Sequence, residues 1–294
     1  MTTVVEARGL RKDFGALRAL HGLDLSIEAG EVFGYLGPNG AGKTTTIRLL
    51  FDFIRPTAGS VSVLGGSGAD PAVRRRVGYL PADLPVPRRH TANDVFDFYG
   101  ALRGGFDRRW VDQLLQRFEL DPTRPVGQLS TGNRRKVGIV QAVAHRPEFV
   151  VLDEPSSGLD PLLQREFALL VRELVSDGAT VLMSSHVLPE VEELADRVGI
   201  LRAGRLVRIA TVDELRQQAR QRIELRTTGA ADCAAFAALP GVVDASADGN
   251  IITITVEGSV DAVIKVAAQF EVDRIVTHET PLEEIFLGFY EGSQ

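Results

Sequence analysis

The fold of this chain is decided by the stretch Gly37-Pro38-Asn39-Gly40-Ala41-Gly42-Lys43-Thr44-Thr45, which fits the pattern G-x-x-x-x-G-K-[ST]. Residues 31–36 ahead of it predict a short apolar strand, and residues 45–51 behind it predict the first turns of a helix. Glycine allows positive φ and close backbone approach, and a helix N-terminus adds partial positive charge. The stretch therefore predicts a phosphate-binding loop, in which Lys43 reaches the β- and γ-phosphates and the Thr44 hydroxyl ligates Mg²⁺. An ordinary glycine-rich turn is the alternative, and the strand–loop–helix context argues against it.

The length and composition are those of an ordinary globular protein. The chain has 294 residues, of which 44% are hydrophobic, enough for one large or two modest domains. No run approaches eighteen uncharged apolar residues, and the first residues lack the pattern of a signal peptide, so we expect neither a membrane span nor secretion. The single cysteine, Cys233, excludes an internal disulfide and suits a reducing cytosol. A net charge of −6 argues against binding of nucleic acid over the whole surface.

Two adjacent carboxylates, Asp153 and Glu154, follow the uniformly apolar run 149–152. A strand of this kind belongs in the middle of a parallel sheet, and ligands of such sheets sit at the carboxyl ends of the strands. We therefore expect Asp153 to bind Mg²⁺ and Glu154 to polarise a water molecule. Adjacent acids in a simple turn are the alternative, which the phosphate loop on the same chain makes less attractive.

Three further residues have both a structural and a functional interpretation. His186 ends a second buried run, 179–186, and the polar groups at the same sheet edge favour a functional role over a structural one. Ser130 is a candidate N-cap for a helix that follows it. Phe14 is either a half-exposed strand residue or an aromatic plate for a nucleobase.

The rest of the chain divides into two parts. The first thirty residues predict β-structure, the segment from Thr91 to about Val143 predicts helices, and residues 211–219 predict a helical connector. From Arg222 the pattern restarts, with strands over 223–226, 251–256 and 272–276 and helices over 231–239 and 260–270. A last helix is predicted from Thr280, with an apolar stripe of Leu282, Ile285, Phe286 and Phe289. This second part has no catalytic constellation.

With these motifs in order, residues 4–215 resemble the ATP-binding subunit of an ABC transporter. Residues 37–45 match the Walker A loop of that family, 129–133 its signature, 150–154 the Walker B strand with the catalytic glutamate, 157–160 the D-loop, and His186 the switch histidine. The C-terminal part is similar to the extension of bacterial ABC-2-type exporter subunits of the drug-efflux group. The resemblance implies an α/β P-loop NTPase fold with antiparallel β and helical subdomains, plus a small α+β domain. The ABC domain is expected over residues 1–219, with its helical subdomain at about 84–147, and an accessory or regulatory domain over 220–294.

The resemblance also implies a site shared by two subunits in a head-to-tail homodimer. ATP and Mg²⁺ are the expected ligands, with Lys43, Glu154 and His186 as catalytic residues and Thr44 and Asp153 on the metal. The expected nucleotide contacts are Phe14, Gly37, Pro38, Asn39, Gly40, Ala41, Gly42, Lys43, Thr44, Thr45, Ser130, Gly132 and Asp160. Separate transmembrane permease subunits would hold the chain at the inner face of the cell membrane, in the cytoplasm, with no nucleic acid as a partner.

The sequence departs from the family pattern at two places, and two alternative functions stay open. The signature reads Leu-Ser-Thr-Gly-Asn, and Ala82 stands where the family has the Q-loop glutamine, which helps to hold Mg²⁺ and the water. We expect Asp83, one residue further on, to take that place. A low-turnover, nucleotide-gated regulatory subunit is one alternative, and a soluble ABC ATPase acting on nucleic acid or ribosomes is another. The transported molecule cannot be read from this sequence.

Overall fold

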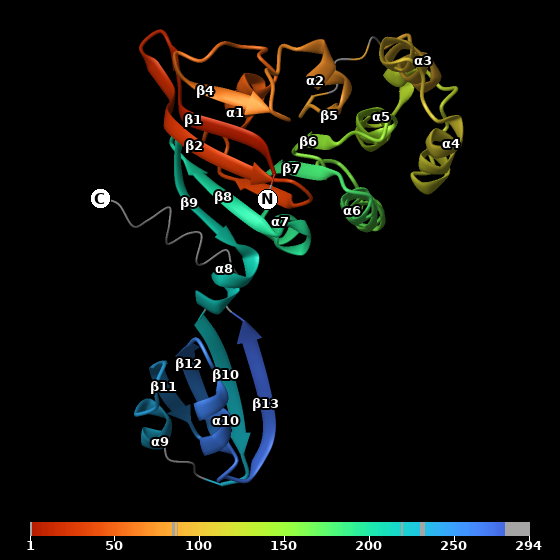
Figure 1. Ribbon diagram of the computed structural model, residues 1–294. Coiled ribbons are helices and arrows are strands. Elements are labelled where there is room, and N and C mark those ends of the chain that lie inside the picture. The colour runs from red at the N-terminus through yellow and green to blue at the C-terminus, as the bar shows by residue number, and fades with distance from the viewer. Residues whose placement is uncertain (1, 84–85, 87, 219, 230–232, 280–294) are drawn as a thin grey trace. The chain divides into compact units, whose positions relative to one another are not determined.

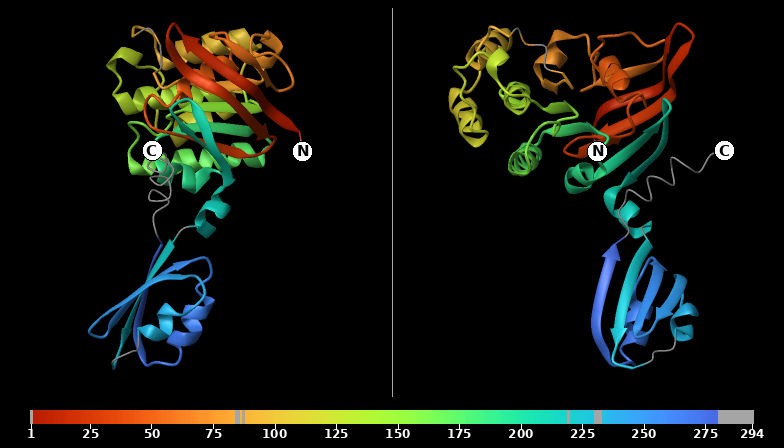
Figure 2. Two further views of the ribbon diagram at one scale, coloured as in Figure 1. Left: turned by 90° about the vertical axis from the view of Figure 1, so that its left-hand side faces the viewer. Right: turned by 180° about the vertical axis from the view of Figure 1, so that it is seen from behind.

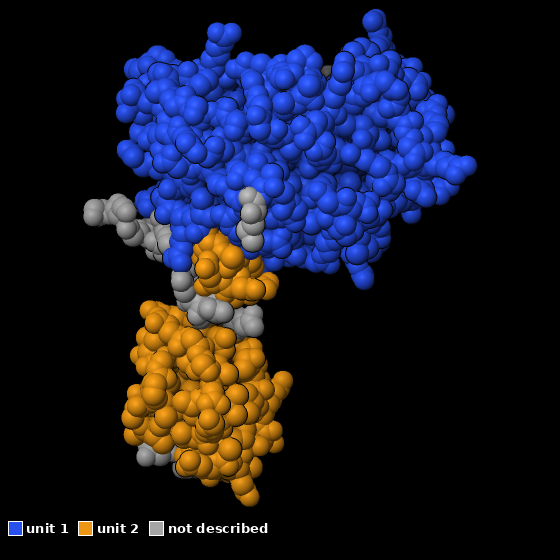
Figure 3. Space-filling model, viewed as in Figure 1, with its two compact units in different colours: residues 1–209 blue, residues 210–294 orange. Residues whose placement is uncertain are grey.

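The computed structural model describes residues 2–83, 86, 88–218, 220–229 and 233–279. The chain forms two compact units, Met1–Ile209 and Ala210–Gln294 (Figure 3). Their boundary lies ten residues before the expected one at 219 and falls inside strand β9 (Arg205–Thr211). Helix α8 (Val212–Gln218), expected as a connector at the end of the first domain, is therefore grouped with the second unit.

A six-stranded sheet forms the centre of the first unit, in the order β5-β6-β7-β3-β8-β9. Its other strands are β5 (Val77–Leu80), β6 (Phe149–Asp153), β7 (Thr180–Ser185), β3 (Val32–Leu36) and β8 (Arg197–Arg202). Strands β5 to β8 are parallel, and every residue of β3, β6 and β7 is buried, as their apolar runs predict. Leu36 pairs with Ser185 and Asp153 with Ser184, so three strands end at one edge of the sheet.

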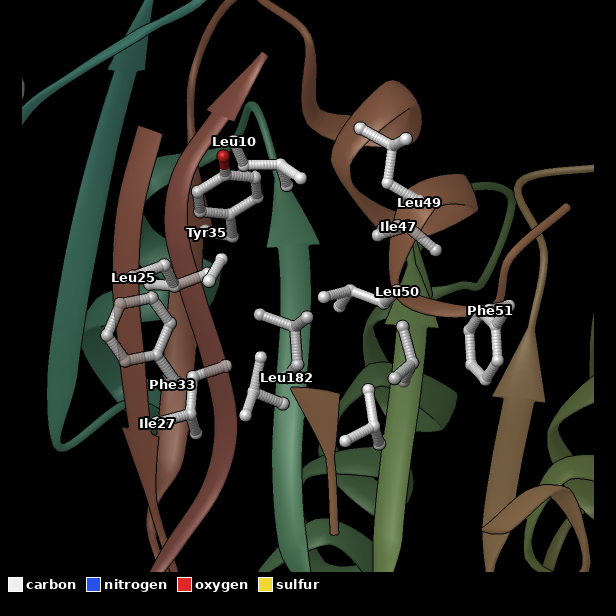
Figure 4. Packing of buried hydrophobic residues seen from close by; sticks show 14 of the residues in the cluster. Leu10, Leu25, Ile27, Phe33, Tyr35, Ile47, Leu49, Leu50, Phe51 and Leu182 are labelled. Atoms are coloured by element: carbon white, nitrogen blue, oxygen red, sulfur yellow. The ribbon is translucent and has the colours of Figure 1, made fainter. Parts of the chain in front are cut away.

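One face of this sheet is covered by a second, antiparallel sheet and by helix α1 (Lys43–Leu50) (Figures 1 and 2). The second sheet has the order β2-β1-β4, with β2 (Leu17–Glu28), β1 (Thr3–Phe14) and β4 (Ala58–Val63). The alternating apolar residues of β2 point inward, where Leu25 and Ile27 join Phe33 and Tyr35 of β3 in one core (Figure 4). This core fixes the strand that leads into the phosphate-binding loop.

The other face of the six-stranded sheet is covered by helices. Helices α5 (Thr131–Val143), α6 (Pro161–Ser176) and α7 (Leu188–Leu194) contact β5, β7 and β3 (Figure 1). The segment between β5 and α5 is helical, as expected, with α2 (Pro71–Arg75) before it and α3 (Ala92–Arg103), α4 (Arg108–Arg117) and the 3₁₀ turn η1 (Val126–Gln128) within it. Helix α3 begins at a capping box of Thr91 and Asp94, and α5 begins at the N-cap Ser130, both at predicted positions.

Beyond helix α8, the described residues of the second unit form a four-stranded antiparallel sheet with two short helices. Its elements are β10 (Arg220–Thr227), α9 (Ala234–Ala237), β11 (Val242–Asp248), β12 (Ile251–Glu257), α10 (Asp261–Ala267) and β13 (Val272–Glu279). The order β11-β12-β10-β13 and the β-α-β-β-α-β succession are those of a ferredoxin-like fold. Strand β11 was not expected, because only Val242 and Ala245 along it are even half-buried and its alternation is weak. The last predicted helix, from Thr280 with Leu282, Ile285, Phe286 and Phe289, lies outside the described residues.

Candidate active site

The loop between β3 and α1 has the backbone that its glycines predict. Gly40 and Gly42 have φ of 80° and 110°, in the region that glycine adopts without strain. Gly37 packs so closely on the neighbouring strand that a Cβ there would lie 2.5 Å from the carbonyl oxygen of Leu201. Helix α1 starts at Lys43, so its free N–H groups face the loop. The loop is therefore built to receive an anion.

The other loop residues take distinct positions around this backbone. Pro38, Asn39 and Gly40 form the exposed tip of the loop, while Ala41 is buried. The N–H of Ala41 donates to the carbonyl of Pro38 at 3.1 Å and closes the turn. Thr45 is half-buried in the first turn of α1. The tip is thus open to solvent, whereas its base is anchored in the core.

Lys43 is buried, with 6% of its surface exposed, and its ammonium group is held inside the loop. Its Nζ donates to the carbonyl of Gly37 at 2.5 Å and lies 3.2 Å from Oε1 of Glu154. A buried ammonium needs such partners, because burial of an unpaired charge costs several kcal/mol. These contacts join the phosphate-binding loop to the acid at the end of β6.

Asp153 is 1% exposed, and both of its carboxylate oxygens accept hydrogen bonds from hydroxyl groups. Thr44 Oγ1 donates to Oδ2 at 3.0 Å, and Ser184 Oγ donates to Oδ1 at 2.5 Å. Hydroxyl and carboxylate oxygens are hard ligands of the kind that Mg²⁺ takes, and Mg²⁺ usually binds one or two protein groups beside substrate phosphates. The pair Thr44 and Asp153 therefore fits the expected metal. Ser184 was not singled out in the sequence, although its place at the polar end of an apolar strand is the signal for it.

Glu154 directly follows β6 in a left-handed backbone conformation, with φ of 52°. Such a conformation is uncommon for a residue other than glycine and clusters at functional sites. Its N–H donates to the carbonyl of Ser184 at 3.1 Å, and its Oε2 lies 2.7 Å from Nδ1 of His186. The turn thus directs the carboxylate between His186 and Lys43.

Five predicted site residues therefore meet at one edge of the parallel sheet, namely Lys43, Thr44, Asp153, Glu154 and His186. Four others lie apart from them. Phe14 is 47% exposed near Lys12, and Asp160 caps helix α6 through a 3.0 Å bond from the N–H of Leu163.

The remaining two lie at the start of α5. Ser130 accepts a hydrogen bond from the N–H of Asn133 at 3.2 Å, and a Cβ on Gly132 would lie 2.7 Å from the carbonyl oxygen of Gly158. No hydrogen bond or ion pair among the described residues joins Phe14, Ser130, Gly132 or Asp160 to the five residues at the sheet edge. Within one chain, the predicted site is therefore divided into two parts. One is the sheet-edge cluster of the five residues named above, and the other is these four residues.

A glycine-rich loop at a helix N-terminus, a buried lysine, and a carboxylate pair at the end of a parallel strand define a P-loop nucleotide-binding protein. The comparisons then name the family. A family model described as ABC transporter matches residues 20–157. The chain is 35% identical to the daunorubicin resistance ATP-binding protein DrrA3 of Streptomyces coeruleorubidus, over 97% of this chain and 95% of that protein.

Two further matches agree with this one. The bacitracin transport ATP-binding protein BcrA of Bacillus licheniformis is 32% identical over 77% of this chain and 76% of that protein. A solved structure of the ATP-binding subunit of an ABC transporter superposes with a TM-score of 0.68, at 29% identity, covering 74% of this chain and 93% of that one. The chain belongs to the ABC transporter family of ATP-binding proteins and is an ATPase of that class. The predicted family and fold are confirmed, and the comparisons lend no support to a role on nucleic acid or ribosomes.

Proposed function

We propose that this chain hydrolyses Mg-ATP as one of two nucleotide-binding subunits of an exporter whose membrane-spanning subunits are separate polypeptides. The observation that carries the proposal is the match to the daunorubicin resistance protein, because it extends over 97% of the chain and so includes both units. Among the described residues, no helix is both long and apolar enough to cross a bilayer. By its likeness to that resistance protein, the chain would act at the inner face of the membrane through a permease partner. We propose an antibiotic or a similar small molecule as the cargo.

The phosphates of ATP would bind at the loop between β3 and α1, where Lys43 and the N–H groups of α1 supply positive charge. Phe14, nearly half exposed at the end of β1, would stack on the adenine ring. Ser130, Gly132 and Asp160 take no part in the sheet-edge cluster of their own chain. They would therefore serve the nucleotide held by the second subunit of the dimer.

Thr44 Oγ1 and Asp153 Oδ2 would hold Mg²⁺, which supplies charge neutralisation on the phosphate oxygens. Ser184 keeps the Asp153 carboxylate in place by its bond to the other oxygen. Because phosphoryl transfer depends mostly on positioning and electrostatics, small shifts of these groups are expected to affect the rate strongly.

Glu154 would orient the attacking water and accept its proton, since its carboxylate is the only acidic group of the sheet-edge cluster outside the metal pair. His186 would hold the carboxylate through the Nδ1 contact of 2.7 Å and leave its other ring nitrogen toward the phosphates. Lys43 would neutralise the charge that develops on the transferred group.

The experiment combines turnover with transport. The purified chain, alone and with its permease, is assayed for Mg²⁺-dependent ATP hydrolysis. Cells that lack the gene are then complemented with the parent or with Glu154→Gln and loaded with daunorubicin or bacitracin. We expect the parent, and not the variant, to lower the accumulation of at least one of them. Equal accumulation of both compounds would contradict the cargo class, and no turnover even with the permease would contradict the ATPase role itself.

A further inference from the structure

Arg135, in the second turn of α5, is 6% exposed and uses its whole guanidinium group on backbone carbonyls. Arginine has five N–H donors, and here each of them has a carbonyl acceptor. Nε donates to Pro155 at 3.1 Å, Nη1 to Pro81 at 2.7 Å and Ala82 at 2.8 Å, and Nη2 to Asp153 at 2.5 Å and to Glu154. One side chain therefore joins the turn after β6 to the loop after β5.

The close packing of α5 on β5 makes this reach possible. Gly78 in β5 lies so near the helix that a Cβ on it would be 2.1 Å from the carbonyl oxygen of Ala142. Any larger residue at 78 would push α5 away from the sheet, and Arg135 with it. The position of Arg135 therefore depends on the glycine at position 78.

The guanidinium of Arg135 donates only to carbonyl groups, although the carboxylates of Asp153, Glu154 and Asp83 lie near enough to favour its charged form. No ion pair joins it to an acidic side chain among the described residues, and burial lowers the pKa of its guanidinium. Lysine in its place would offer three donors instead of five and could not span both loops. The site is therefore specific for arginine by its geometry.

Three of the five carbonyls belong to Asp153, Glu154 and Pro155, which are consecutive in the chain. Successive carbonyls in an extended strand point in opposite directions, so their convergence on one cation requires a tight turn. The turn is the one in which Glu154 has φ of 52°. Such strain persists only where the surroundings hold it, and Arg135 contributes three hydrogen bonds to the carbonyls of this turn.

We propose that Arg135 is a positioning residue, which holds Glu154 in its left-handed conformation and makes this conformation depend on the loop after β5. The inference rests on the proposed role of Glu154 in hydrolysis. It also gives the loop at Ala82 a connection to the acid that needs no side chain at position 82, because the carbonyls of Pro81 and Ala82 make it.

The test compares Arg135→Lys with Val137→Ala, a cavity-forming change at a fully buried position of the same helix. For Arg135→Lys we expect kcat to fall about 10-fold or more, as for a misplaced reacting group, with the Kd for Mg-ATP within about threefold of the parent. Val137→Ala should lower the Tm but keep kcat. Parent kcat in folded Arg135→Lys, or parallel losses of kcat, Kd and Tm in both variants, would overturn the proposal.

A second variant keeps the proposal testable if Arg135→Lys does not fold. Ala82→Gly loosens the loop after β5 and should lower kcat about twofold to threefold without changing the Kd, whereas Ala69→Gly, in a remote exposed loop, should not. An unchanged kcat in Ala82→Gly would overturn the proposed dependence of Glu154 on the loop after β5. Glu154→Gln is assayed beside them: if it keeps turnover, the proposed role of Glu154 fails and the inference with it, and if it alone loses turnover, only the role of Arg135 fails. Absence of turnover in the parent with its permease would instead contradict the proposed function.

Discussion

The two units each contain a β-sheet, but only one of them gathers reactive groups. In the first unit β6, β7 and β3 run in parallel, so their carboxyl ends lie side by side and bring Asp153, Ser184 and the phosphate-binding loop together. In the second unit every neighbouring pair of strands is antiparallel, so the strand ends alternate between two edges. Parallel topology concentrates the chemistry of distant segments at one edge, and antiparallel topology disperses it.

The charged groups of the second unit lie along the face of its sheet and not at one edge where strands end. Glu224, Arg226, Arg274 and His278 lie on the face of its sheet around a hollow of about 250 Å³. Glu224 is 3.5 Å from Arg222 and 3.8 Å from His278, so its carboxylate already has basic neighbours. The difference between the units predicts that ATP chemistry belongs to the first one alone.

The largest expected effect comes from Glu154→Gln. The amide keeps the shape of the side chain but cannot accept a proton, so we expect ATP binding to persist while kcat falls about 100-fold or more. The ATP-bound dimer should then be visible by size-exclusion chromatography. Glu148→Gln is the matched control, because Glu148 precedes the same strand at its opposite end and pairs with Arg76 at 2.6 Å. Parent turnover in Glu154→Gln would remove this residue from the mechanism.

Ser184→Ala tests whether the neighbouring strand β7 supports the metal site at the sheet edge. Loss of the hydroxyl frees one oxygen of Asp153, and such supporting bonds are typically worth about 10-fold or more in metal affinity. We expect the Mg²⁺ concentration for half-maximal activity to rise by that factor. Ser185→Ala, beside it on β7, serves as the control, since Ser185 bonds to Glu190 and Val187 instead. Equal Mg²⁺ titrations for both variants would show that Ser184 does not support the metal site.

A smaller effect is expected at the loop after β5. Ala82 and Asp83 are both exposed, and Asp83 makes no hydrogen bond or ion pair with the described residues, so its role as a substitute ligand stays a prediction. Asp83→Ala should raise the Mg²⁺ requirement about twofold to fivefold if its carboxylate reaches the ion directly or through water. Ala82→Gln should be neutral or mildly activating. Unchanged titration curves for Asp83→Ala would end this idea, and a defect in transport alone would point to docking of the permease.

Truncation after Ala219 tests whether the first unit binds ATP without the second, and we expect no loss of ATP binding. The cut leaves β9 and α8 whole and removes β10 to β13. If the first unit alone binds nucleotide, the Kd for Mg-ATP should stay within about twofold of the parent, since no group of the sheet-edge cluster is lost. Self-association or assembly with the permease should weaken. A chain that folds after truncation but no longer binds ATP would break the division between the units.

Much of the candidate site could be predicted because its residues belong to short sequence patterns that can be recognised without the structure. The loop has a fixed spacing of glycines around Lys43, and Asp153, Glu154 and His186 end apolar runs that can only be central strands. No local pattern shows which side chain will bond to a residue in a distant segment of the chain. Ser184 bonds to a residue 31 positions away, and Arg135 resembles any basic residue in a helix until its acceptors are known.

By itself, then, the sequence determined that this protein has a phosphate-binding loop, a carboxylate pair after a buried strand, and two successive domains of different pattern. Only the tertiary structure decided which strands are neighbours, that Glu154 has a left-handed backbone, and that Arg135 joins two loops. The physical reason is the range of the interactions. Backbone conformations and apolar periodicity depend on residues a few positions apart. The order of the strands and the acceptors of a buried cation depend on how the whole core packs, as the close approach of α5 to Gly78 shows.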